Sequence, residues 1–135
     1  MEYKFLKHTA DIAFQAYGKT LNSSFENSAI AMFKAMYPKN IDAKIKKTIK
    51  IKGRDLESLL YNFLQELLFL LDSKGFFLSK VKVEVNEKNL ILKAIVWGDT
   101  ASKYPISLQV KAVTYNNMII KKIKDKWTCQ VVLDV

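Results

Sequence analysis

The alternation of hydrophobic and polar residues divides the chain into two helical segments and a larger number of strands. Two segments repeat apolar residues every three or four positions, the spacing of one helical face; they span residues 20–37 and 55–73. Other segments alternate apolar and polar residues, as half-buried strands do. These span residues 2–7, 12–17, 44–52, 76–86, 90–97, 106–115, 118–124 and 127–134. The stretch 98–105 is small and polar and predicts a loop.

The two predicted helices have clear start and stop signals. Thr20 and Asp55 precede the first and second helix, and their side-chain oxygens are typical of N-caps. Pro38 prevents the first helix from continuing, and Gly75 favours termination of the second. Because leucines occupy much of the circumference of the second helix, we expect it to be the most buried element.

The connections after the second helix are too short for crossovers, which predicts antiparallel pairing. They are the turns Asn86–Asn89, Asn116-Asn117 and Asp125-Lys126, rich in residues that favour turns. With two helices and a majority of strands, the pattern predicts an α+β fold: a two-layer sandwich in which two helices pack on a largely antiparallel sheet. A length of 135 residues fits a single domain, 1–135.

The formal net charge of +9 is compatible with binding to nucleic acid. All but one of the 22 basic residues are lysine, however, and precise recognition of phosphate or bases usually relies on the planar fork of arginine. Pairs such as Lys50/Lys52 and Lys80/Lys82 are typical of the solvent face of a strand. The composition therefore favours a solvated lysine-rich surface, with weak, salt-sensitive attraction to RNA as the alternative.

The cysteine count and the apolar segments indicate the cellular compartment and exclude some redox and metal chemistry. The single Cys129 excludes an internal disulfide and a thiolate zinc site, and its place in a strand predicts a buried small hydrophobe. No signal peptide is visible, and the most apolar window, Leu59–Leu71, is too short to span a bilayer. We therefore predict a soluble cytoplasmic protein with no membrane partner; lysine-rich strand edges favour a monomer.

Candidate chemistry concentrates at the two ends of the chain. His8, the only histidine, and Asp11 lie between the first two predicted strands, and Asp134 ends the last. If these ends meet, Asp11, Asp134 and an α-carboxylate on Val135 would repel one another unless a cation lay among them. That cation could be Lys111 or a hard metal ion such as magnesium, calcium or manganese.

Each candidate also has a plain structural interpretation. His8 could be a structural hydrogen-bonding group, Asp11 a turn cap and Lys111 one more solvated lysine. The sequence contains no glycine-rich phosphate loop, nucleophile elbow or cysteine–histidine motif. Aromatic residues follow helical and strand periods, which favours the core over a base-stacking role. Residue chemistry alone thus leaves open whether the acidic cluster is functional.

Five short motifs in order resemble the archease family, and the resemblance covers nearly the whole chain. They are His8-Thr9-Ala10-Asp11-Ile12, Ala16-Tyr17-Gly18-Lys19-Thr20-Leu21, Phe25-Glu26-Asn27-Ser28-Ala29 with Ala31-Met32-Phe33, Lys111-Ala112-Val113-Thr114-Tyr115, and Val132-Leu133-Asp134-Val135. Residues 98–105 match no motif, so the resemblance implies no function for them.

This resemblance implies an accessory protein, not an enzyme, that activates the RtcB-type RNA ligase of tRNA splicing. It implies that the protein promotes the GTP- and manganese-dependent guanylylation of a ligase histidine and so multiple turnover. By motif, the functional residues would be Asp11, Lys111 and Asp134; a calcium, magnesium or manganese ion would be bound by Asp11, Asp134 and Val135, with His8 as support. The main partner would be the ligase, and tRNA or tRNA-modifying proteins would be additional partners.

Two other functions stay open beside ligase activation. A lysine-driven module could bind RNA or assist tRNA-processing proteins as a chaperone, and its affinity for RNA would fall with salt. A stand-alone hydrolase could use the same carboxylates to activate water through a divalent ion.

Overall fold

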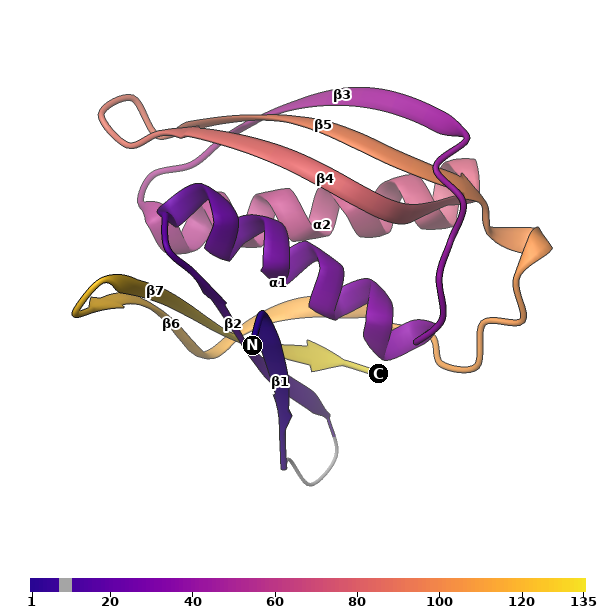
Figure 1. Ribbon diagram of the computed structural model, residues 1–135, viewed down its shortest axis with the longest axis horizontal. Coiled ribbons are helices and arrows are strands. Elements are labelled where there is room, and N and C mark those ends of the chain that lie inside the picture. Colours follow the sequence, from indigo (N-terminus) through magenta and orange to yellow (C-terminus); the bar gives the residue numbers. More distant parts are fainter. Residues whose placement is uncertain (8–10) are drawn as a thin grey trace.

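The computed structural model describes residues 1–7 and 11–135, and it places two helices between two antiparallel sheets (Figure 1). The helices are α1 (Leu21–Met36) and α2 (Leu56–Lys74). The first sheet has the order β1-β2-β7-β6 and consists of β1 (Tyr3–Leu6), β2 (Ile12–Gly18), β7 (Lys126–Asp134) and β6 (Ala112–Ile123). The second has the order β3-β5-β4 and consists of β3 (Ile45–Lys52), β5 (Ile91–Thr100) and β4 (Phe76–Asn86).

The predicted α+β class, with two helices and antiparallel strands, is confirmed. The strands are divided between two sheets, and each helix contacts both of them: α1 packs on β2, β7 and β4, and α2 on β6 and on all three strands of the second sheet. A helix held between two sheets must be apolar on opposite sides, which explains the leucines around α2. No helix in the described ranges is long and apolar enough to cross a membrane.

Both predicted helix starts and the glycine stop are confirmed. The Thr20 and Asp55 side chains accept hydrogen bonds from the backbone N–H groups of Ser23 and Ser58, completing a capping box at each helix. The bonds from Ser58 hold the pKa of Asp55 below its ordinary value. Gly75 adopts the left-handed conformation (φ 64°) that ends α2, a conformation that glycine reaches without steric cost.

A continuous core fills the space between the sheets and the helices. Its largest fully buried side chains include Phe14 of β2, Phe25 of α1 and Phe63 of α2. Cys129 of β7 is also fully buried, and its thiol lies 3.5 Å from the Ser24 hydroxyl. Burial raises the pKa of Cys129 to about 11, so the thiol stays protonated near neutral pH. The prediction of a buried small hydrophobe is confirmed.

The prediction of two strands at 106–115 and 118–124 with a turn at Asn116-Asn117 is wrong. Residues 105–111 lie outside any strand, and β6 is one strand that pairs with β7 on both sides of an irregularity between Thr114 and Ile119. Asn117 has the positive φ (53°) expected of a turn asparagine, but the chain uses it in a bulge and not in a reversal. The final turn is Lys124-Asp125, one residue earlier than predicted.

Strand β5 continues through Trp97 to Thr100, so the predicted loop 98–105 begins too early. Gly98 is opposite Leu78 in the β4–β5 register, and a Cβ atom there would lie 2.1 Å from the Phe77 carbonyl oxygen. The missing side chain is what lets the two strands approach at this point. A short 3₁₀ helix, η1 (Ala101–Lys103), follows.

Helix side chains bond to backbone groups on one outer strand of each sheet. The amides of Val83 and Val85 in β4 donate to the carboxylate of Glu26 (2.7 Å) and the side-chain carbonyl of Asn22 (2.8 Å) in α1. The amide of Val113 in β6 donates to the side-chain carbonyl of Gln65 in α2 (2.8 Å). These bonds fix each helix against the edge of a sheet.

Candidate functional site

Strands β2 and β7 bring the two acidic ends of the chain together. Their antiparallel register ends with Ile12 opposite Leu133; Asp11 directly precedes Ile12, and Asp134 directly follows Leu133. Residues that face each other across an antiparallel pair have Cα atoms roughly 4.5–5.5 Å apart, so the residues next to the Ile12–Leu133 pair are also near one another. Asp11 and Asp134 therefore lie at the same end of the first sheet.

Lys111 lies at the same end of the first sheet, where its backbone contacts Asp134. Its N–H donates to the main-chain carbonyl of Asp134 (2.8 Å), and the next residue, Ala112, is the cross-strand partner of Asp134. The start of β2, the end of β7 and the start of β6 thus lie side by side. Asp11, Lys111 and Asp134, predicted as functional from separate motifs, lie at the adjoining ends of β2, β6 and β7.

The exposure of these residues suits an outward-facing site. Asp134 and Lys111 are exposed, and Asp11 and Val135 are half-buried. Leu133, between Asp134 and the rest of β7, is fully buried and anchors the strand end in the core. Because the side chains alternate along β7, anchoring Leu133 inward directs Asp134 outward.

The oxygen donors near the end of β7 meet only part of what a divalent cation requires. Among the residues that the structure describes, no group of three or more histidine, cysteine, aspartate or glutamate side chains could hold a metal ion. Two carboxylates and a main-chain oxygen of Val135 are all hard donors, which suit magnesium, manganese or calcium. Such a set is incomplete for these ions, so water or a partner would have to supply the other ligands. His8, predicted as support, lies outside the described residues.

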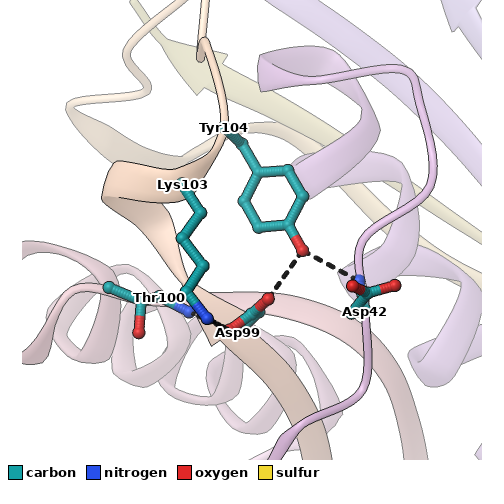
Figure 2. Close-up of polar contacts among 5 residues, drawn as sticks. All are labelled: Asp42, Asp99, Thr100, Lys103 and Tyr104. Carbon is teal, nitrogen blue, oxygen red and sulfur yellow. Dashed lines mark hydrogen bonds and ion pairs between the residues drawn. The ribbon is translucent and has the colours of Figure 1, made fainter.

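Sequence analysis missed a buried acid, Asp99, that ties two connections together (Figure 2). Its side chain is 2% exposed and accepts three hydrogen bonds: from the Thr100 amide (2.8 Å), the Lys103 ammonium (3.2 Å) and the Tyr104 hydroxyl (2.7 Å). The Tyr104 hydroxyl oxygen in turn accepts a hydrogen bond from the Asp42 backbone amide (3.1 Å). Satisfied polar groups of this kind fix loop geometry, so we interpret the cluster as structural.

Replacing Asp99 by asparagine is expected to destabilise the fold most near neutral pH and least in acid. The Tyr104 hydroxyl, then the Thr100 amide and Lys103, hold the pKa of Asp99 below its ordinary value of 3.8. A carboxyl with a lowered pKa gives stability that is present above about pH 4 and lost as the pH falls through the folded-state pKa. The difference in melting temperature between wild type and Asp99→Asn should therefore narrow from pH 7 to pH 3. A constant difference would contradict this origin; Asp125→Asn, at an exposed turn, is the control.

Comparison with known proteins identifies the family. The model of the Archease protein family (MTH1598/TM1083) matches residues 3–135. The chain is 38% identical over 137 residues to the protein archease of Sulfurisphaera tokodaii, covering 99% of both proteins. It is 41% identical over 135 residues to that of Pyrococcus abyssi, covering 96% of this chain and 95% of the relative.

Solved structures agree with the fold. The solution structure of Methanobacterium thermoautotrophicum protein 1598 matches with a TM-score of 0.86 and 35% identity over 99% of both chains. A Thermotoga maritima crystal structure, described as an archease and possible chaperone, matches with a TM-score of 0.69 at 22% identity over 98% of this chain and 96% of that one. At that identity the likeness concerns the fold alone. Since family model and relatives both span nearly the whole chain, the protein belongs to the archease family.

Proposed function

We propose that this archease is an accessory protein that activates an RtcB-type RNA ligase in the cytoplasm, promoting its guanylylation and multiple turnover. The observation that supports the proposal is that Asp11, directly before β2, and Asp134, at the end of β7, flank the paired residues Ile12 and Leu133 in a chain of this family. Two acids placed at the ends of adjacent strands contribute little to packing. They can, however, be presented to a partner in a fixed geometry.

Guanylylation of the ligase shifts negative charge among the phosphate groups of GTP. When a ligase histidine attacks the α-phosphate of GTP, charge builds on the phosphate oxygens and on the leaving group, and catalysis depends mainly on positioning and charge neutralisation. A divalent cation held at the shared edge would supply such neutralisation. Asp11 and Asp134 would bind and orient it from the archease side, with an oxygen of Val135 as a further donor.

Lys111 has two uses within this proposal. Its backbone bond to the Asp134 carbonyl holds the start of β6 against the end of β7, which would steady the strand end that carries the Asp134 carboxylate. Its exposed ammonium group would reduce the mutual repulsion of the acids or contact phosphate charge. Replacing Lys111 by methionine removes the charge and keeps the backbone bond, and so separates the two uses.

A single-turnover guanylylation assay with a cognate RtcB-type ligase, GTP and manganese tests the proposal. We expect Asp134→Asn and Asp11→Asn each to reduce the stimulated rate by roughly 10- to 100-fold, the range typical of weakening the support of a bound metal ion. Asp125→Asn carries the same change at the exposed turn at the far end of β7 and should stimulate like wild type.

Stimulation that survives in Asp11→Asn/Asp134→Asn would contradict the proposal. The alternative of a stand-alone hydrolase is checked with the purified archease alone, using phosphomonoester and phosphodiester substrates with magnesium, manganese and calcium. Hydrolysis that is lost in the same double variant would replace ligase activation as the function of this site.

A further inference from the structure

The outward side of the second sheet carries a concentration of lysines that the proposed function does not use. Inward residues of this sheet, such as Val83, Leu92 and Val96, are buried against the helices. Between them, six outward lysines are all exposed. They are Lys46, Lys50 and Lys52 of β3, Lys93 of β5, and Lys80 and Lys82 of β4. We call this surface the lysine face; in the described part of the chain no helix or strand lies over it (Figure 1).

The charge of the lysine face is one-sided. Glu84 is its one acidic residue, against six lysines. Register sets Lys93 of β5 between Lys50 of β3 and Glu84 of β4, so a single acid faces two lysines in this row and leaves an excess positive charge. A polyanion bound over this row would neutralise the excess, so the surface is complementary to a negatively charged polymer.

The spacing of the lysines suits a repeating anion. Lys80 and Lys82, like Lys50 and Lys52, are two residues apart on a strand, which places them roughly 6.5–7 Å from each other on one side. A phosphodiester chain laid along the strands would meet one ammonium group after another. Lysine provides a mobile point charge and no planar fork, so contacts of this kind read the backbone and not the base sequence.

An aromatic ring and a hollow distinguish the lysine face from a merely charged surface. Trp97 of β5 is half-buried in its midst, opposite Lys46 and Lys80, and the Lys80 ammonium lies 4.7 Å from the centre of its ring. Beside it, a hollow of about 510 Å³ is lined by three lysines and one acid, with apolar residues between them: its charged residues are Lys50, Lys82, Lys93 and Glu84. Open sheets with aromatic side chains commonly bind unpaired bases by stacking.

From these observations we infer that the lysine face binds single-stranded RNA, with phosphates on the lysines and an unpaired base on Trp97. The inference concerns a surface separate from the carboxylates. Asp11, Lys111 and Asp134 lie at strand ends of the first sheet, and the helices lie between the two sheets (Figure 1). It therefore does not depend on ligase activation, and RNA and a protein partner could be bound at the same time.

Fluorescence anisotropy with a labelled single-stranded 12-nucleotide RNA tests the inference. If about four phosphates are neutralised, affinity should fall roughly 50-fold between 50 and 200 mM salt. The triple variant Lys50→Gln/Lys82→Gln/Lys93→Gln should lose most of the binding and lower the salt slope by about two. A control with the same charge change, Lys4→Gln/Lys121→Gln/Lys122→Gln, replaces exposed lysines of β1 and β6 and should bind like wild type.

A second readout separates RNA from an acidic protein as the partner. In a Trp127→Phe background the remaining tryptophan is Trp97. Single-stranded RNA should quench its emission by stacking, whereas polyglutamate of equal charge should not. Absence of RNA binding at 50 mM salt, equal loss of affinity in both triple variants, or equal competition and quenching by polyglutamate would each overturn the inference.

Discussion

Replacing Phe14 by alanine is expected to cost about 3–5 kcal/mol of unfolding free energy, the range for large-to-small changes at buried aromatic sites. Phe14 is 0% exposed and packs in the core from β2, three residues after Asp11. Small domains are stable by about 5–15 kcal/mol in total, so one substitution would remove a large share. Guanidinium unfolding followed by circular dichroism measures the loss.

Phe5 provides the matched control for this experiment. It is the cross-strand partner of Phe14 in the β1–β2 register, but it is 47% exposed. Phe5→Ala should therefore cost only about 1 kcal/mol, since nearly half of this side chain is already exposed to water. Equal losses in the two variants would show that burial in β2 is not the source of the stability.

The second large effect is expected at Gly98, where alanine should destabilise the fold by about 1–3 kcal/mol or more through overpacking. Its Cβ atom would meet the Phe77 carbonyl oxygen at 2.1 Å and the Phe76 ring at 2.8 Å. A backbone oxygen cannot rotate away as the end of a side chain can, so β4 and β5 would have to separate. Chemical denaturation and amide exchange in β4 would record this.

Gly75→Ala separates steric contact from backbone conformation. Nothing lies within 4 Å of a Cβ atom at Gly75, but its φ of 64° disfavours any L side chain. The expected cost there is about 1 kcal/mol and purely conformational. If Gly98→Ala were no more destabilising than Gly75→Ala, the close approach of the two strands would not be limiting.

The helices could be predicted from sequence because their signals are local. The Thr20 and Asp55 caps and the Gly75 stop depend on neighbours only a few residues away. The strand boundaries around Gly98 and Asn117 could not be predicted, since they depend on distant partners. Gly98 continues β5 because Phe77 approaches it, and Asn117 occurs within β6 because β7 pairs on both sides of it.

The candidate site shows the same limit. Composition and motifs select Asp11, Lys111 and Asp134, but only the register of β2, β7 and β6 determines that they are neighbours. A shift of one residue would move every side chain of a strand to the other side of its sheet. Asp99 was missed for the opposite reason: its partners are nearby in sequence, but a small and polar segment gives no sign that its acid is buried.

The bonds from Glu26, Asn22 and Gln65 to strand amides have a consequence for how copies of this protein behave at high concentration. An outer strand with unused N–H groups is a template onto which another molecule can add a strand and begin a fibril. At β4 and β6, helix side chains already occupy some of those donors. On β3, the outer strand at the opposite edge of the second sheet, lysines would repel an identical strand. The polar side chains of the helices thus reduce aggregation at the sheet edges, while the apolar side chains of the same helices fill the core.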